Sequence, residues 1–350
     1  MTQPFIVQPR PGQRVAAAAA AGPGAHVAVG GATRATPITE EAFGPLAEFL
    51  RGEGVTDAFV NGADGLYVDA GSGASRVPGW RASEREVRDL AVRLIARGGR
   101  HIDDATPCMD VRLAGGVRVH AVLPPVAKAG TALSIRIPVV SGAGLDELAG
   151  GGTFDDRVRA WLIRMIEARE NVLVTGATGS GKTTLLGALL AHVPHSERIV
   201  TIEDVAELRV AHPHHVALEA RQANLEGAGG VGLPRLVRES LRMRPDRIVV
   251  GECRGEEVRE LLTALNTGHD GGAGTLHASG LADVPARLEA LGALAGMDDH
   301  AVARQVTSAI AWVLHLERGS DGVRRLASVG RFAADGDRLD IEEVRPWLAS

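Results

Sequence analysis

The sequence predicts a two-domain α/β protein whose C-terminal domain is built on an open, largely parallel sheet. Three observations support this fold class. The 350 residues are too many for one ordinary compact domain and about right for two. Hydrophobic residues make up 45% and charged residues 23%, a balance that allows a sizeable core. From residue 171 onward, apolar strand-like runs alternate with helical stretches, as is typical of parallel sheets.

The composition divides the chain into four parts. Residues 1–37 are rich in Ala, Gly and Pro and contain no acidic residue, so we expect a disordered arm. Residues 38–140 predict a small N-terminal α/β domain, and residues 155–350 predict the C-terminal domain. Residues 141–154 are rich in glycine and predict a linker, with a hinge near Gly142–Gly152.

Short elements are expected in the N-terminal domain. A capping box at Ser83 and Glu86 opens a helix that runs to about Ala96 and stops at two glycines. Helical spacing and apolar runs predict the remaining elements. These are a helix over 41–51, strands over 55–61 and 66–69 around the turn 61–65, and strands over 109–113, 117–123 and 131–137.

The C-terminal domain begins with a helix over 155–168 and continues as strands alternating with helices. The expected strands cover 171–175, 198–202, 216–219, 247–251 and 274–277. The helices that separate most of them cover 182–192, 234–243 and 256–266. Three final runs predict antiparallel edge strands or a meander over 313–317, 324–332 and 339–344.

Charge and cysteine content argue against several classes of protein. The net charge of −5 argues against a protein whose main surface binds along a nucleic acid. The two cysteines, Cys108 and Cys253, are far apart and exclude a disulfide framework or a four-Cys zinc site, which fits a reducing cytosol. No apolar run approaches the ~20 residues needed to span a bilayer.

A Walker A loop follows the first strand of the C-terminal domain. Residues 176–183 fit the pattern G-x-x-x-x-G-K-[ST], with an apolar strand before them and a helix after them. Glycines let backbone N–H groups curl around phosphate oxygens, and the helix N-terminus adds partial positive charge. The pattern predicts a site for ATP and Mg²⁺. Its residues are Gly176, Ala177, Thr178, Gly179, Ser180, Gly181, Lys182, Thr183 and Thr184.

The lysine in this loop distinguishes it from a chance turn in a chain with 44 glycines. Of 38 basic residues, only Lys128 and Lys182 are lysines. A chain that uses arginine almost everywhere else therefore has lysine where a compact point charge suits a phosphate better than a planar fork. We expect Lys182 to reach the β- and γ-phosphates and Thr183 to offer its hydroxyl to Mg²⁺.

Two other strand ends carry acids. The apolar strand 247–251 ends at Glu252, which fits a Walker B position, and the strand 198–202 is followed by Glu203 and Asp204. Each could be an ordinary solvated acid. Because strand C-termini in such sheets converge on the ligand crevice, we expect Glu252 to activate water or hold the metal and Glu203 to support metal or water.

Histidines form two groups in the sequence. His269 and His277 lie near a Gly-rich turn and a strand end, and His277 is a candidate sensor of the γ-phosphate. The run 212–215 contains three histidines, but no carboxylate or cysteine stands at a matching spacing, so a structural role is favoured over a metal site.

The order of these motifs resembles a known family. Walker A is followed by residues 202–208 (IEDVAEL), 247–255 (RIVVGECRG) and 268–278 (GHDGGAGTLHA). They are similar to the Asp box, Walker B and His box of the secretion ATPases of type II, type IV and type IV pilus systems. Further segments resemble the tight-adherence (Flp) pilus and conjugal-transfer-associated branch, namely 117–125, 221–227, 240–246 and 266–270.

The resemblance implies a RecA-like P-loop NTPase domain preceded by a small α/β, PAS-like N-terminal domain. It further implies a homohexameric ring, ATP at the interdomain cleft, a cytoplasmic protein peripheral to the inner membrane, and an inner-membrane platform protein as partner. In the family, arginines of the N-terminal domain reach the phosphates, and the matching positions are Arg112, Arg118 and Arg136, while Arg254 follows the Walker B acid. Arginines that merely cover a sheet face are the alternative.

One departure from the family pattern bears on hydrolysis. The His box usually has a small hydroxyl residue or Ala at 272 and Thr or Ser at 274, but this chain has Gly272 and Gly274. Because glycine has no side chain to contact phosphate or water, this departure favours nucleotide binding over full turnover. Three hypotheses follow: an ATPase motor for pilus assembly or secretion, a nucleotide-gated assembly protein with weak hydrolysis, and a DNA-translocating conjugation motor.

Overall fold

The computed structural model describes residues 38–52, 54–62, 65–71, 73–113, 116–137, 143–221, 229–335 and 338–348, without the side chains of 334 and 335. The expected arm 1–37, Gly142 and residues 222–227 of the family segment lie outside the described residues. No described helix is long and apolar enough to cross a membrane.

The expected helix over 41–51 is broken into three short pieces. These are α1 (Glu40–Phe43), the 3₁₀ turn η1 (Gly44–Leu46) and α2 (Ala47–Leu50). Gly44 takes φ +54° at the end of α1, and Pro45 follows it without an N–H to continue the helix. The single-helix prediction was wrong because apolar spacing was given more weight than this Gly-Pro pair.

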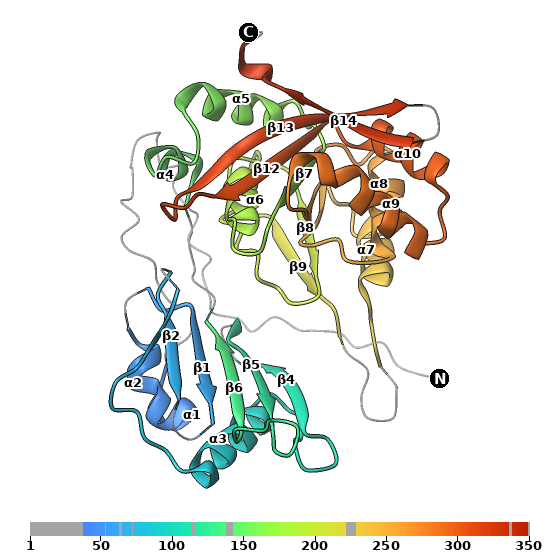
Figure 1. Ribbon diagram of the computed structural model, residues 1–350. Coiled ribbons are helices and arrows are strands. Elements are labelled where there is room, and N and C mark those ends of the chain that lie inside the picture. The colour runs from blue at the N-terminus through green and yellow to red at the C-terminus, as the bar shows by residue number, and fades with distance from the viewer. Residues whose placement is uncertain are drawn as a thin grey trace, which may run out of the picture. The chain divides into compact units, whose positions relative to one another are not determined.

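The N-terminal domain is a six-stranded antiparallel sheet with helices on one face (Figure 1). Its strand order is β3-β2-β1-β6-β5-β4, and α3 (Glu84–Arg97) begins at the expected capping box of Ser83 and Glu86. Alternate residues such as Val119 and Ile135 point to one face of the sheet and pack into the core. The residues between them point to the opposite, open face. The strands are β1 (Asp57–Asn61), β2 (Leu66–Asp69), β3 (Ala74–Arg76), β4 (Cys108–Arg112), β5 (Arg118–Val122) and β6 (Ala132–Arg136), of which β3 was not predicted.

The C-terminal domain has an eight-stranded sheet of order β14-β13-β12-β7-β11-β10-β8-β9. The pairings from β12 through β7 to β9 are parallel, and β12, β13 and β14 are joined antiparallel, so the predicted parallel sheet with antiparallel edge strands is confirmed. The strands are β7 (Val172–Gly176), β8 (Ile199–Glu203), β9 (His215–Glu219), β10 (Arg247–Val250), β11 (Ala273–His277), β12 (Trp312–Arg318), β13 (Arg324–Asp335) and β14 (Arg338–Val344).

Helices cover both faces of this sheet (Figure 1). Side chains alternate between two cores, so that Val172 and Val174 of β7 join one and Leu173 joins the other. The first core includes α4 (Leu145–Gly150), α5 (Asp156–Glu167) and α6 (Lys182–Leu190). The second includes α7 (Leu233–Leu241), α8 (Glu257–Leu265), α9 (Val284–Leu294) and α10 (Asp299–Ala309). The short turns η3 (Leu281–Asp283) and η4 (Pro346–Leu348) complete the domain.

The linker expected over residues 141–154 contains a helix. Its middle forms α4, whose first residue, Leu145, is fully buried in the core that also contains α5 and α6. The expectation of a glycine hinge through Gly152 therefore needs correction, because burying Leu145 ties this stretch to the C-terminal domain. Glycine density alone did not reveal the buried anchor.

One buried ion pair joins separate elements of the C-terminal domain. The guanidinium of Arg247, at the start of β10, has no exposed surface. Its Nε lies 2.6 Å from Glu197 Oε2, and its Nη2 donates to the carbonyl of Ile166 at 2.8 Å. Arg169 Nη1 lies 3.3 Å from the other oxygen of Glu197. Removing one partner of such a pair leaves an uncompensated charge in the interior.

We therefore expect Arg247→Ala to lower the free energy of unfolding by about 3–5 kcal/mol. The matched control is Arg242→Ala, because Arg242 also has an ion pair but is 73% exposed; its loss should cost about 0.5 kcal/mol or less. Denaturant unfolding of both variants measures the difference. Equal effects would mean that the buried pair contributes no more than the surface pair.

Candidate nucleotide-binding site

The Walker A loop connects the buried strand β7 to helix α6, as the sequence predicts. Lys182 begins α6, and its side chain turns back over the loop. Its Nζ donates to the carbonyls of Gly176 at 2.8 Å and Ala177 at 2.9 Å. Burial lowers the pKa of Lys182 from its ordinary value and Arg254 adds to this, while the Glu252 carboxylate opposes it. The ammonium thus lies beside the loop, where a phosphate would meet it.

Two glycines of the loop have positions that other residues could not take. Gly176 has φ +146°, and a Cβ there would clash with the carbonyl of Leu316 and with Ser180 Oγ. Gly181 precedes α6 with φ +99°, in the left-handed region. The loop therefore needs these glycines both for its backbone shape and for close packing against β12.

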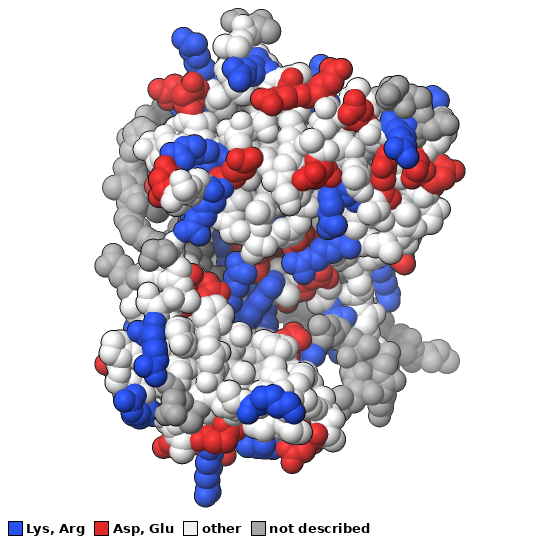
Figure 2. Space-filling view, in the orientation of Figure 1, with Lys and Arg blue, Asp and Glu red and all other residues white. Residues whose placement is uncertain are grey.

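A cleft of about 550 Å³ opens beside the loop. Figure 2 shows Lys and Arg side chains gathered next to Asp and Glu around a hollow in this face of the molecule. Residues of both domains line the cleft. The N-terminal domain contributes Arg118 and Arg136, and the C-terminal domain contributes Gly179, Lys182, Thr183, Thr184, Glu203, Asp204, Glu252, Arg254, Thr275, His277 and Arg324, among others.

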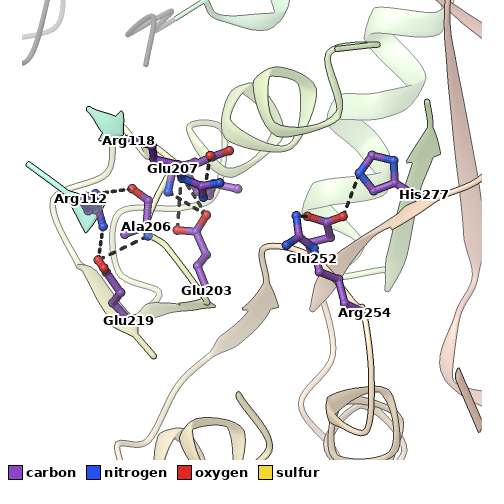
Figure 3. Close-up of polar contacts among 10 residues, drawn as sticks. Arg112, Arg118, Glu203, Ala206, Glu207, Glu219, Glu252, Arg254 and His277 are labelled. Atoms are coloured by element: carbon purple, nitrogen blue, oxygen red, sulfur yellow. Dashed lines mark hydrogen bonds and ion pairs between the residues drawn. The ribbon is translucent and has the colours of Figure 1, made fainter. Parts of the chain in front are cut away.

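The Walker B acid lies between two basic side chains (Figure 3). Glu252 Oε1 is 2.8 Å from His277 Nε2, and Glu252 Oε2 is 2.5 Å from an Arg254 terminal nitrogen. Burial lowers the pKa of His277, with Lys182 adding to the effect and Glu252 opposing it. The lowered pKa favours the neutral imidazole, in which a proton on Nε2 can be donated to Glu252. The structure brings His277, from the His box, to Glu252 and Arg254 of the Walker B segment.

Glu203 is buried at the end of β8 and binds the backbone that follows it. Its Oε1 accepts hydrogen bonds from the N–H groups of Glu207 and Leu208, both at 3.0 Å. Its side chain also packs against Gly251, where any Cβ would clash with it. Burial raises the pKa of Glu203 to about 7, although these hydrogen bonds and Arg112 oppose the rise. The carboxylate expected to support a metal thus shapes the loop 204–208.

The three predicted arginines form one row across the N-terminal sheet. Arg112 pairs in register with Arg118, and Arg118 with Arg136, so all three lie on the open face of the sheet. Arg118 lies 2.8 Å from Glu207 Oε1 (Figure 3). Arg112 contacts Glu219 and donates to the carbonyl of Ala206 at 2.8 Å. Arg136 lines the cleft. Of the three, Arg118 and Arg136 border the cleft and Arg112 holds the loop beside it.

Gly272 and Gly274 do not face the cleft. A Cβ on Gly272 would meet Leu265 and the carbonyl of Ile248, and one on Gly274 would meet Leu261 at 3.2 Å. Both positions point toward α8, because side chains alternate along β11 and the cleft is lined by Thr275 and His277 instead. The expectation that glycine at 272 and 274 removes phosphate or water contacts is therefore corrected, since a side chain there would enter the core.

Three of the residues around the cleft that make polar contacts there were not predicted from the sequence. Thr275 donates its hydroxyl proton to the carbonyl of Gly251 at 2.5 Å, and Glu207 pairs with Arg118. Arg324 reaches the loop from β13, where its Nε donates to the carbonyl of Gly179 at 2.9 Å. Thr275 and Glu207 stand inside motifs that were recognised, so their proximity to the site could have been inferred. No sequence signal indicates Arg324, which is 145 residues beyond Gly179.

His269 and His212, from the two histidine groups of the sequence, contact nearby main-chain carbonyls. His269 contacts the carbonyl of Ala264 at 3.2 Å and does not line the cleft. His212 contacts the carbonyl of Pro194 at 3.1 Å. Among the described residues, no group of three or more His, Cys, Asp or Glu is placed to hold a metal ion.

The phosphate loop, the parallel sheet and the preceding α/β domain define a RecA-like P-loop protein. The family model for type II/IV secretion system proteins matches residues 39–327. This chain therefore belongs to the type II/IV secretion system protein family.

Known proteins similar to this chain include a putative conjugal transfer protein of Mycobacterium tuberculosis. It is 50% identical over 312 residues, which cover 87% of this chain and 88% of that protein. The type IV secretion system protein VirB11 of Bartonella henselae is 30% identical over 269 residues, covering 67% of this chain and 75% of its own. Among solved structures, the Legionella pneumophila ATPase DotB shares the fold, with a TM-score of 0.55, 23% identity and coverage of 84% of this chain and 80% of its own.

The burial of Glu203 predicts a pH dependence of stability. Its folded pKa of about 7 lies above the ordinary value of 4.5, so the folded protein binds this proton more tightly than the unfolded chain. This contribution is therefore full below pH 4.5 and is lost as the pH rises through about 7. The difference in unfolding free energy between wild type and Glu203→Gln should fall by about 3 kcal/mol over that range. Denaturant unfolding at pH 4.5, 6 and 8 measures it, and a constant difference would contradict the assignment.

Proposed function

We propose that this protein is an ATPase motor that powers pilus assembly or secretion. The observation that carries the proposal is the position of Glu252. It lines the same cleft as Lys182 and Thr183 and is held by His277 and Arg254. A carboxylate beside a phosphate loop, oriented by two basic groups, can accept a proton from a water that attacks a γ-phosphate.

Nucleotide binding would first change the hydrogen-bond partners of Lys182. Its ammonium donates to two carbonyls of its own loop, and phosphate oxygens would replace these acceptors with charged ones. The N-terminus of α6 adds its partial positive charge to the same place. Ground-state binding thus depends on the loop and on Lys182, whereas hydrolysis depends in addition on Glu252.

The oxygen ligands at the cleft fit Mg²⁺. The Thr183 hydroxyl and the Glu252 carboxylate, the latter through water, are the groups that would hold it. The bound ion would neutralise phosphate charge. Glu203 fits this role less well, because hydrogen bonds from backbone N–H groups already occupy its oxygens. We assign it instead to holding the loop 204–208.

The arginine row would couple nucleotide to domain position. Arg118 pairs with Glu207 and borders the cleft, so a triphosphate would compete with Glu207 for its guanidinium. Arg118 and Arg136 would then stabilise charge on the transferring phosphoryl group. Because both belong to the N-terminal domain, each hydrolysis event would release that domain and allow it to move against the other.

The relatives support the biological setting. Their names place them in conjugal transfer and type IV secretion. By analogy we propose a homohexameric ring at the cytoplasmic side of the inner membrane, acting on a platform protein there. The second hypothesis, a nucleotide-gated assembly protein with weak hydrolysis, loses its main support because Gly272 and Gly274 face the core. A DNA-translocating motor is disfavoured by the net charge of −5 and would show DNA-stimulated turnover.

Replacing Lys182 tests the nucleotide site. We expect Lys182→Ala to abolish ATP hydrolysis, measured as phosphate release by the purified protein, because the phosphates lose their point charge. Lys128→Ala is the matched control, since Lys128 is the only other lysine and is exposed in the N-terminal domain. It should hydrolyse ATP at the wild-type rate. Wild-type activity in Lys182→Ala would refute the site.

Replacing Glu252 separates binding from hydrolysis. Glu252→Gln keeps the shape of the side chain but cannot accept the proton, so we expect kcat to fall about 100-fold or more with little change in nucleotide affinity. Glu256→Gln, four residues further on and exposed, serves as the control. If Glu252→Gln retains full kcat, another group is the base, whereas a loss of affinity alone would assign Glu252 to binding.

A further inference from the structure

Arg324 closes over the outside of the Walker A loop. It is the first residue of β13, and its Nε donates to the carbonyl of Gly179 at 2.9 Å. Its side chain also packs on Gly181, where a Cβ would lie 3.0 Å from Arg324 Cδ. Loop and side chain line the same cleft. The C-terminal strands thus reach the phosphate loop directly.

The hydrogen bond from Arg324 fixes one peptide unit of the loop. The carbonyl of Gly179 and the N–H of Ser180 belong to the same planar peptide, so orienting one orients the other. That N–H in turn contacts the carbonyl of Ala177 at 3.3 Å. Gly179 has φ +75° and no side chain to limit its rotation. Arg324 therefore adds a second hydrogen bond to a peptide unit of the loop that is otherwise held only by its N–H.

The terminal nitrogens of Arg324 have no partner among the described residues, although the side chain borders the phosphate site. Its neighbour Arg325 differs in this respect. Arg325 binds Asp321 through two nitrogens, at 3.0 and 2.6 Å, and does not line the cleft. Successive residues of a strand point to opposite faces, which explains why two adjacent arginines have such different surroundings.

We propose that Arg324 is a further nucleotide-binding residue: its Nε positions the Walker A loop, and its terminal nitrogens bind the phosphates of the nucleoside triphosphate. The guanidinium fork suits phosphate oxygens, which accept two parallel hydrogen bonds from it. This inference rests on the proposed nucleotide site. It adds a cation from β13 to the Lys182 ammonium and to the two arginines of the N-terminal domain that border the cleft.

Nucleotide titration of matched variants tests the proposal. A fluorescent ATP analogue is titrated into wild type, Lys182→Ala, Arg324→Ala, Arg324→Lys and Arg325→Ala. We expect Arg324→Ala to raise Kd about tenfold, the loss of a charged hydrogen bond. Arg324→Lys should recover part of the affinity, because an ammonium keeps the charge but not the fork. Arg325→Ala should stay within about twofold of wild type.

Competition by inorganic pyrophosphate separates phosphate contact from a general structural effect. If Arg324 binds phosphate, Arg324→Ala should weaken pyrophosphate about as much as the ATP analogue, with an unchanged thermal unfolding midpoint. Wild-type affinity in Arg324→Ala overturns the proposal, as do equal losses in Arg324→Ala and Arg325→Ala or unchanged pyrophosphate affinity. Failure of the nucleotide site itself would look different, since wild type and Lys182→Ala would then bind the analogue equally.

Discussion

The burial of one carboxylate, Glu203, organises the loop on which both domains meet. Placing a carboxylate at the end of a buried strand is costly, and the rise of its pKa to about 7 expresses that cost. Backbone N–H groups of Glu207 and Leu208 offset part of it. In doing so they fold the chain after β8 so that Glu207 faces Arg118 and the carbonyl of Ala206 faces Arg112. The same side chain needs a glycine at 251, next to Glu252.

The charged groups around the cleft are balanced by individual ion pairs and hydrogen bonds rather than by one broad region of opposite charge. Glu252 lies between Arg254 and His277, Glu207 meets Arg118, and Lys182 is held by loop carbonyls. Lys182 and Arg118 each have an acceptor that a triphosphate would replace. Nucleotide binding would therefore exchange one set of partners for another, which costs less than bringing unpaired charges together in a partly buried site. Arg324 extends this arrangement to the edge strands of the sheet.

Glycine has two separate functions in this chain. In the loop, Gly176 and Gly181 allow a backbone that other residues resist. At the start of β11, Gly274 and the preceding Gly272 leave room for leucines of α8. Comparison with a family motif records only whether glycine matches the pattern at each of these positions. Whether a side chain at a given glycine would point toward the cleft or into the core decides whether that position can affect the nucleotide.

The sequence by itself determined the parallel sheet, its order of strands and helices, the Walker A loop and the acids at strand ends, because these depend on periodicity and short spacing. It failed where Gly44-Pro45 interrupts a helix and where Leu145 anchors a stretch that looks like a linker. Tertiary structure alone decided that Arg112, Arg118 and Arg136 form one row, because register between strands sets which residues are opposite. It also brought Arg324 to Gly179, since packing of β13 beside β12 joins positions that no local pattern connects.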